Sequence, residues 1–314
     1  MSDGWRSAAL HGAVLAILIA GFFVLPAYHE GALARSMVLA VFAMGFNLVF
    51  GYTGLLSLGH ALFFAAGMYG LGLTMAHGGL AAAPALIVGV ICGGAAAGLI
   101  GALALRTQGV AFMIVTLMFA QAGFLTALYF GEWTRGDEGF VIAQGAREIG
   151  GVALSDADAR YLAALALFAV VFVGLAFIVR SGFGRALVAI RENEERATML
   201  GYDVKRLKLQ AMVLSGALSG LAGAAYALLF GYVGATFASV QYSILPLLWV
   251  LLGGAGTTIG PLIGTVLMFY LIDFTSGLTS AYLLFVGLAL VLLTLFAPQG
   301  VAGLIRRRLA PWLP

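Results

Sequence analysis

The sequence predicts an all-α integral membrane protein, a polytopic, glycine-rich bundle of about ten transmembrane helices with one amphipathic helix on its cytoplasmic side. Three observations predict this class. The chain of 314 residues is 62% hydrophobic and only 9% charged, whereas soluble domains carry about 25% charged residues. Apolar stretches long enough to cross a bilayer recur along the chain. Glycine occurs 44 times, about twice its usual frequency, and it lets helix backbones approach closely in lipid.

The apolar stretches divide the chain into spans, because a membrane-crossing helix needs about 20 apolar residues. The predicted spans cover residues 8–26, 33–50, 57–76, 82–105, 109–130, 160–180, 207–231, 241–253, 258–276 and 280–297. The eighth is short, so we expect either a broken helix or an extension back toward Tyr232. No soluble domain is evident, and we interpret residues 1–314 as one transmembrane domain.

The basic residues predict how the chain is oriented. If the N-terminus is cytoplasmic and the spans alternate, twelve of the 16 basic residues lie inside: Arg6, Arg106, Arg180, Arg185, Arg191, Arg196, Lys205, Arg206, Lys208, Arg306, Arg307 and Arg308. The other four, Arg35, Arg135, Arg147 and Arg160, lie outside. This bias follows the positive-inside rule. It predicts cytoplasmic N- and C-termini, an acidic external loop at 131–159 and a cytoplasmic segment at 181–206.

The cytoplasmic segment carries a helical pattern. Leu187, Ile190, Ala197 and Leu200 recur near helical spacing among charged residues, and Gly201 then stands where a helix C-cap would. We expect one amphipathic helix over 185–201. It is either a docking element for a soluble partner or an ordinary solvated loop, and the pattern alone leaves both open.

Polar side chains within apolar spans are costly unless they are paired or face water. Those we assign to a possible pathway or gate are Asn47, Thr53, Ser57, His60, Gln121, Gln241 and Thr257. Any one of them is more often a bridge between helices, but as a set they indicate a polar seam. Glycine-rich breaks at Gly51–Gly59 and Gly253–Pro261 lie in opposite halves of the chain, and each is either a gate or a tight turn.

Several functions lack their residues in this sequence. There is no P-loop of the form GxxxxGK(S/T), so we expect ATP to be hydrolysed by other subunits. The four histidines are scattered, and neither HExxH nor GxSxG occurs. We therefore predict no catalytic residues, no metal ligands and no cofactor bound by this chain. The net charge of +3 indicates membrane orientation and not nucleic-acid binding.

Four motifs in the same order cover nearly the whole chain. They are the run Gly51–His60 with Phe63 and Phe64 after it, the segment Gly184–Gly201, the run Leu252–Pro261 and the ending Phe296–Leu304. On these motifs the chain resembles the permease subunits of branched-chain amino-acid ABC transporters, and it is similar in particular to the LivM-type subunit.

The resemblance implies a permease that forms half of a translocation path in a bacterial inner membrane. Its implied partners are a second permease subunit, two ATPase subunits that use ATP and Mg, a periplasmic substrate-binding protein and membrane lipid. Glu195, Ala197 and Gly201 occupy positions of the EAA-xxx-G pattern of importer permeases, with Arg196 in place of the middle alanine. The residues assigned to coupling with the ATPase are Arg185, Arg191, Glu192, Glu195, Ala197 and Gly201.

The motifs concern packing and coupling and leave the solute open. A related permease for urea, amides or aromatic acids is therefore the main alternative. An ion-coupled secondary transporter would need ionisable relays at mid-membrane, and only Asp273 and His60 are candidates. A membrane enzyme would need a nucleophile–base pair or a metal cluster, which the sequence does not suggest.

Overall fold

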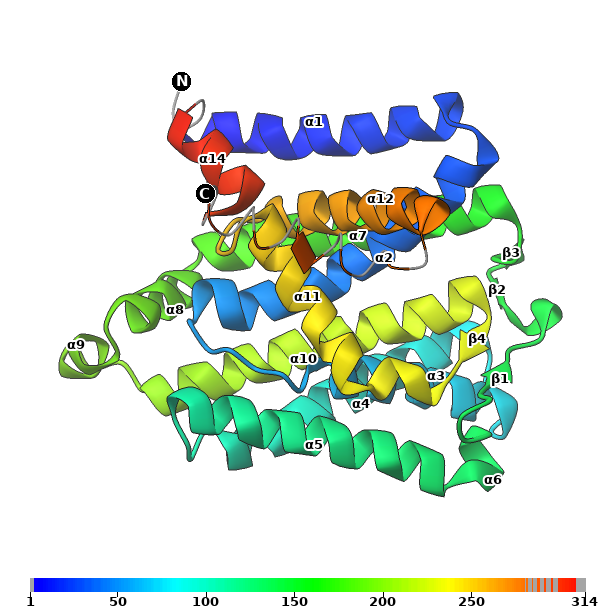
Figure 1. The fold of residues 1–314 in the computed structure, drawn as a ribbon, viewed down its shortest axis with the longest axis horizontal. Coiled ribbons are helices and arrows are strands. Elements are labelled where there is room, and N and C mark those ends of the chain that lie inside the picture. Colours follow the sequence, from blue (N-terminus) through cyan, green and yellow to red (C-terminus); the bar gives the residue numbers. More distant parts are fainter. Residues whose placement is uncertain are drawn as a thin grey trace.

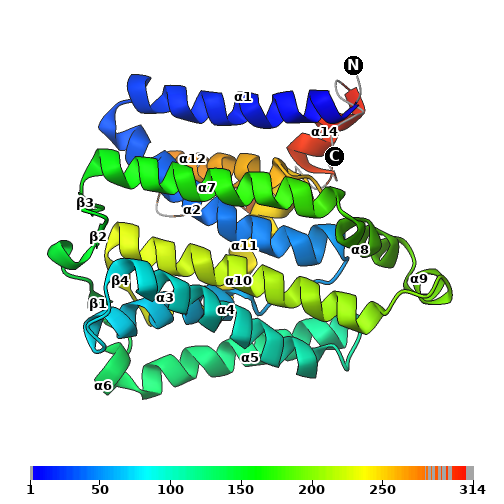
Figure 2. The same cartoon turned by 180° about the vertical axis from the view of Figure 1, so that it is seen from behind.

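The computed structural model is a bundle of helices that lie side by side, most of them along one common direction (Figure 1). It describes residues 3–279, residues 299–308 and isolated positions from 281 to 295. Figure 2 shows the same bundle from behind, with α7 and α10 running across it. The prediction of an all-α polytopic membrane protein is confirmed.

Nine apolar helices lie within the described residues. They are α1 (Asp3–Val24), α2 (Ala27–Asn47), α3 (His60–Ala76), α4 (Ala82–Ala104), α5 (Gly109–Tyr129), α7 (Ala157–Arg180), α10 (Val204–Phe230), α11 (Val240–Gly253) and α12 (Gly260–Leu278). Six are long and apolar enough to cross a membrane, namely α4, α5, α7, α10, α12 and α2 with its π-helical extension η1 (Leu48–Tyr52). The predicted tenth span, 280–297, lies outside the described residues apart from isolated positions.

The eighth predicted span is a short helix, and it does not extend back to Tyr232 as one expectation had it. α11 contains 14 residues with Pro246 inside it. Before it, Tyr232–Val233 form the strand β4, and Ala235–Ala238 form the 3-10 helix η3. The helix begins only after Ser239, whose backbone is extended (φ −64°, ψ 155°) and whose side chain caps α11 by accepting from Tyr242 N.

The connections gather at two opposite ends of the bundle (Figure 1). One end holds α6 (Gly131–Thr134), η2 (Gln144–Ala146) and two short antiparallel pairs, β1 (Phe140–Val141) with β4 and β2 (Glu148–Ile149) with β3 (Val152–Ala153). This is the predicted external loop. The other end holds α8 (Gly182–Glu192), α9 (Glu194–Met199), α14 (Gly300–Arg308) and the start of α1. This is the predicted cytoplasmic side.

Glycine lets α3, α4 and α10 approach one another backbone to backbone. A Cβ on Gly93 of α4 would lie 2.5 Å from Gly216 O and 2.6 Å from the Cα of Gly220, both on α10. A Cβ on Gly67 of α3 would overlap the Gly220 carbonyl. Lipid supplies no hydrophobic force between helices, so this close van der Waals contact is what holds the three together.

Two adjacent glycines on α4 test this packing. Gly93→Ala is expected to destabilise the bundle by about 1–3 kcal/mol, because its methyl group meets backbone that cannot move aside. Gly94→Ala is the matched control, since its Cβ would lie 3.5 Å from the Cβ of Ala217, an ordinary contact. The unfolding midpoint in detergent, followed by tryptophan fluorescence, should fall for the first variant only. Equal midpoints would contradict the packing argument.

Candidate functional site

The two glycine-rich breaks, from opposite halves of the chain, meet at the end of α2. Asn47 donates from Nδ2 to Thr257 O at 2.9 Å and accepts at Oδ1 from the backbone N–H of Gly256, also at 2.9 Å. Asn47 is 2% exposed. A Cβ on Gly51 would lie 2.5 Å from Gly256 N, so the two backbones touch. One amide side chain thus satisfies two backbone groups of the second break.

Arg191, from the last turn of α8, reaches the same place. Its Nη1 donates to the backbone carbonyl of Gly51 in the π-helical turn. The guanidinium also packs on the second break, since a Cβ on Gly256 would lie 2.8 Å from Nη1. The stem packs on Gly54, whose Cβ would lie 3.2 Å from Cγ. Arg191 therefore joins the predicted cytoplasmic segment to both breaks at once.

The first break is tied into the bundle by a second set of buried bonds. His60, at the start of α3, is fully buried, and its Nε2 lies 2.8 Å from Ser215 Oγ on α10. Ser215 donates its hydroxyl proton to Gly45 O on α2 at 2.6 Å, so Nε2 of His60 must be the donor to Ser215. This chain of bonds joins α2, α3 and α10.

Two further side-chain acceptors hold the backbone of this break. Thr116 Oγ1 on α5 accepts from Leu58 N, and Ser243 Oγ on α11 accepts from Ala61 N, each at 3.1 Å. The second break is held in a similar way, because Thr258 Oγ1 lies 3.1 Å from His11 Nε2 on α1. Both breaks are therefore fixed by side chains from several helices.

The structure divides the predicted helix 185–201 in two. α8 ends at Glu192, the backbone of Asn193 is extended with φ −162° and ψ 106°, and α9 begins at Glu194. The side chain of Asn193 caps α9 by accepting from Arg196 N at 2.8 Å. This cap replaces the bonds that a continuous helix would have made.

The apolar face of this segment is smaller than the pattern suggested. Leu187, Ile190 and Ala197 are buried, but Leu200 is 71% exposed, contrary to expectation, and Met199 is 85% exposed. Gly201 does end α9, with φ +88°. Its N–H bonds to Thr198 O, and the N–H of Tyr202 bonds to Ala197 O, a Schellman cap.

Two of the other residues assigned to coupling, Glu192 and Glu195, line a charged cavity. Arg185, Glu192 and Glu195 are exposed. The cavity, of about 450 Å³, separates α8 and α9 from the α4–α5 turn. Lys208, 8% exposed, closes one side by pairing with Glu194 at 2.6 Å.

The remaining pathway candidates are less well placed in this network. Ser57 is buried and accepts from Gly59 N, while the hydroxyl of Thr53 donates to Leu48 O, five residues earlier in the chain. Gln121 lies partly exposed halfway along α5, and Gln241 lies exposed at the start of α11. Neither glutamine joins the two breaks.

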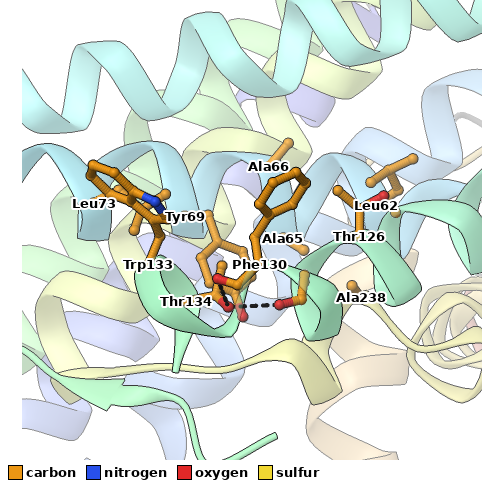
Figure 3. Close-up of a pocket in the computed structure, with 12 residues that line it drawn as sticks. Leu62, Ala65, Ala66, Tyr69, Leu73, Thr126, Phe130, Trp133, Thr134 and Ala238 are labelled. Atoms are coloured by element: carbon orange, nitrogen blue, oxygen red, sulfur yellow. Dashed lines mark hydrogen bonds between the residues drawn. The ribbon is translucent and has the colours of Figure 1, made fainter. Parts of the chain in front are cut away.

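Two features at the predicted external end were not anticipated. An apolar cavity of about 420 Å³ lies between α3 and α5, lined by residues that include Leu62, Tyr69 and Trp133 (Figure 3). Arg35, Arg147 and Arg160 also converge near Phe230. The sequence held one signal for this cluster, because these arginines are three of the four basic residues predicted to lie outside.

Comparison with known proteins places this architecture in a family. Residues 28–296 match the family described as "Branched-chain amino acid transport system / permease component". The chain is 28% identical over 319 residues to the high-affinity branched-chain amino acid transport system permease protein LivM of Salmonella typhimurium, and equally to that of Escherichia coli. Each alignment covers 95% of this chain and 75% of the relative.

A third similarity is to the probable branched-chain amino acid transport permease protein LivM of Methanocaldococcus jannaschii, 34% identical over 103 residues. It covers 32% of this chain and 30% of the relative. No solved structure matches the chain. The family match runs from α2 past α12 and includes both glycine-rich breaks, α8 and α9. The chain therefore belongs to the family of permease components of branched-chain amino acid transport systems.

Proposed function

We propose that this chain forms half of the membrane path of an ATP-driven importer for branched-chain amino acids. The observation that carries the proposal is the contact of Arg191 with Gly51 O and Gly256, which connects α8 to both breaks of the bundle. Family membership and the names of the relatives support the solute class. The proposed assembly adds a second permease, two ATPase subunits that use ATP and Mg, and a periplasmic binding protein.

In the proposed mechanism the ATPase docks on α8 and α9 from the cytoplasm of a bacterial cell. Met199 and Leu200 offer it an apolar contact, and the exposed Glu192, Glu195 and Arg185 of the same segment offer it charge. ATP binding moves α8, and Arg191 transmits this movement to the π-helical turn and, through Gly256 and Asn47, to the second break. Coupling between the ATPase and the membrane path needs one structural element whose conformation both can bias. In this proposal, that element is the contact of Arg191 with the two breaks.

The alternatives differ in what they require. A permease for urea, amides or aromatic acids would keep the same coupling and change only the solute. An ion-coupled transporter would need titratable relays at mid-membrane. His60 is instead engaged with Ser215, and Asp273 is exposed near the end of α12, so the geometry favours the ATP-driven proposal.

The docking surface can be tested by adding charge to it. Leu200→Glu is expected to weaken binding of the ATPase subunits in co-purification by roughly ten- to a hundredfold, because burying that side chain at an interface is worth about 1.5–3 kcal/mol. Glu195→Arg combined with Gly201→Pro should act alike, since proline cannot adopt the left-handed cap. Val152→Glu, an equivalent change at the opposite end, is the control. Unchanged co-purification would overturn the docking surface.

The link through Arg191 predicts loss of coupling without loss of assembly. Arg191→Gln should leave the ATPase bound and active but lower ATP-driven uptake about tenfold, because it removes a charge-assisted hydrogen bond. Arg191→Lys should restore part of the uptake, since lysine keeps a charged donor. Arg180→Gln, an exposed arginine at the end of α7, is the charge-matched control.

A double-mutant cycle sharpens this test. Asn47→Leu should uncouple in the same way, and combining it with Arg191→Gln should add little, because both changes break one connected link. If ATPase binding and uptake fell in parallel in every variant, Arg191 would be an ordinary docking or structural contact and the proposed link would be wrong.

The solute is tested in vesicles that contain all subunits. Saturable, ATP-dependent uptake of leucine, isoleucine and valine that disappears when this chain is omitted is the expected result. Uptake of only urea or an aromatic acid would keep the machine and change its solute. Uptake without the ATPase subunits would contradict the importer proposal.

A further inference from the structure

Three arginines from different elements converge on the carboxyl end of α10. Arg35 of α2 and Arg160 of α7 hold their guanidinium carbons 5.2 Å and 5.8 Å from the centroid of the Phe230 ring. Arg147, between η2 and β2, places Nη1 3.4 Å from Leu229 O. Its guanidinium lies against the backbone of Gly231, where an added Cβ would be 2.8 Å from Nη1. They are three of the four arginines predicted to be external.

These cations lack a counter-ion within the part of the chain that the structure describes. No ion pair there includes Arg35, Arg147 or Arg160. Arg147 is only 8% exposed, and the Nε atoms of Arg147 and Arg160 are buried with no hydrogen-bond partner. The aromatic ring and the helix C-terminus offset some of the charge. They leave the Nε donors of Arg147 and Arg160 without a partner among the described residues, while Arg35 is exposed and presents its donors to solvent.

Nearby carboxylates do not fill this role in the structure. Glu148 and Asp156 follow Arg147 and precede Arg160 in the chain, yet both are exposed and neither pairs with an arginine. Burial lowers the pKa of Arg147, and the neighbouring charge of Arg160 lowers it further. That is the direction expected for cations brought together without an anion. The three arginines therefore have no anionic partner among the described residues.

We propose that Arg35, Arg147 and Arg160 form a carboxylate-binding site at the external end of α10. The planar fork of a guanidinium matches a carboxylate with two parallel hydrogen bonds, and converging forks select that group. The carboxylate belongs either to an amino-acid solute or to an acidic side chain of the protein that delivers it. Only this choice of source depends on the proposed function. The site itself rests on the unpaired Nε donors of Arg147 and Arg160 and on the exposed Arg35, which shares the Phe230 ring with Arg160.

The first arm of the test uses small molecules on the purified transporter in nanodiscs, without ATP. 4-Methylpentanoate keeps the carboxylate of leucine without its ammonium group, and 3-methylbutylamine carries an amine without a carboxylate. Calorimetric titration at low salt should show binding of the acid and not of the amine. Arg35→Gln and Arg160→Gln should each weaken it about tenfold, as expected for loss of a charge-assisted pair, and Arg35→Lys should retain part of it.

Arg135→Gln is the matched control, because Arg135 is exposed in the same external loop and lies outside the cluster.

The second arm measures the affinity of the solute-free binding protein for the same variants over a range of salt. If Arg35→Gln and Arg160→Gln lose affinity for the binding protein but not for 4-methylpentanoate, the carboxylate belongs to an acidic side chain of that protein. If neither arm separates Arg35→Gln and Arg160→Gln from Arg135→Gln, the site is overturned. Uptake is not a readout, so failure of import would not affect this result.

Discussion

Backbone groups released by a helix break cannot be satisfied by lipid, and this constraint organises the bundle. Each unpaired N–H or C=O in the hydrocarbon region costs several kcal/mol. The chain breaks its helices twice, after η1 and after α11, and brings the two breaks together. Asn47 satisfies Gly256 N and Thr257 O, and Arg191 satisfies Gly51 O. The last turn of α8 is thereby bonded to the first break, and the first break to the second.

The sequence predicted the helices well because each span is a local property of apolar runs. It also selected Asn47, Ser57, His60 and Thr257 by a sound rule, that a polar group within an apolar span needs a partner. It could not identify the partners, because Asn47 and Gly256 are 209 residues apart and no periodicity connects them. Gln121 and Gln241 were selected by the same rule, but they lie away from the hydrogen bonds that join the two breaks. A polar residue type within an apolar span therefore does not by itself give the position of the residue in the bundle.

The break at Asn193 was open to prediction. Asparagine followed by Glu194 and Glu195 is an N-cap with acidic residues in the first helical turn, whereas the apolar spacing from Leu187 to Leu200 suggested one continuous helix. Local capping prevailed because Ala197 can still be buried after the bend while Leu200 is left exposed. The bond from Arg191 to Gly51 O could not have been read from its charge, since Arg191 is itself exposed and arginines without such a bond look the same in sequence.

The shortness of α11 has a consequence for the surrounding bilayer. Fourteen residues rise about 21 Å at about 1.5 Å each, against a hydrocarbon core of about 30 Å. Such a mismatch would force a lipid-facing helix to thin the membrane around it. Here the remaining depth is covered by β4 and η3, whose Val233, Ala235 and Ala238 are almost fully buried. The shortfall is thus absorbed by protein, so the bilayer beside α11 need not thin.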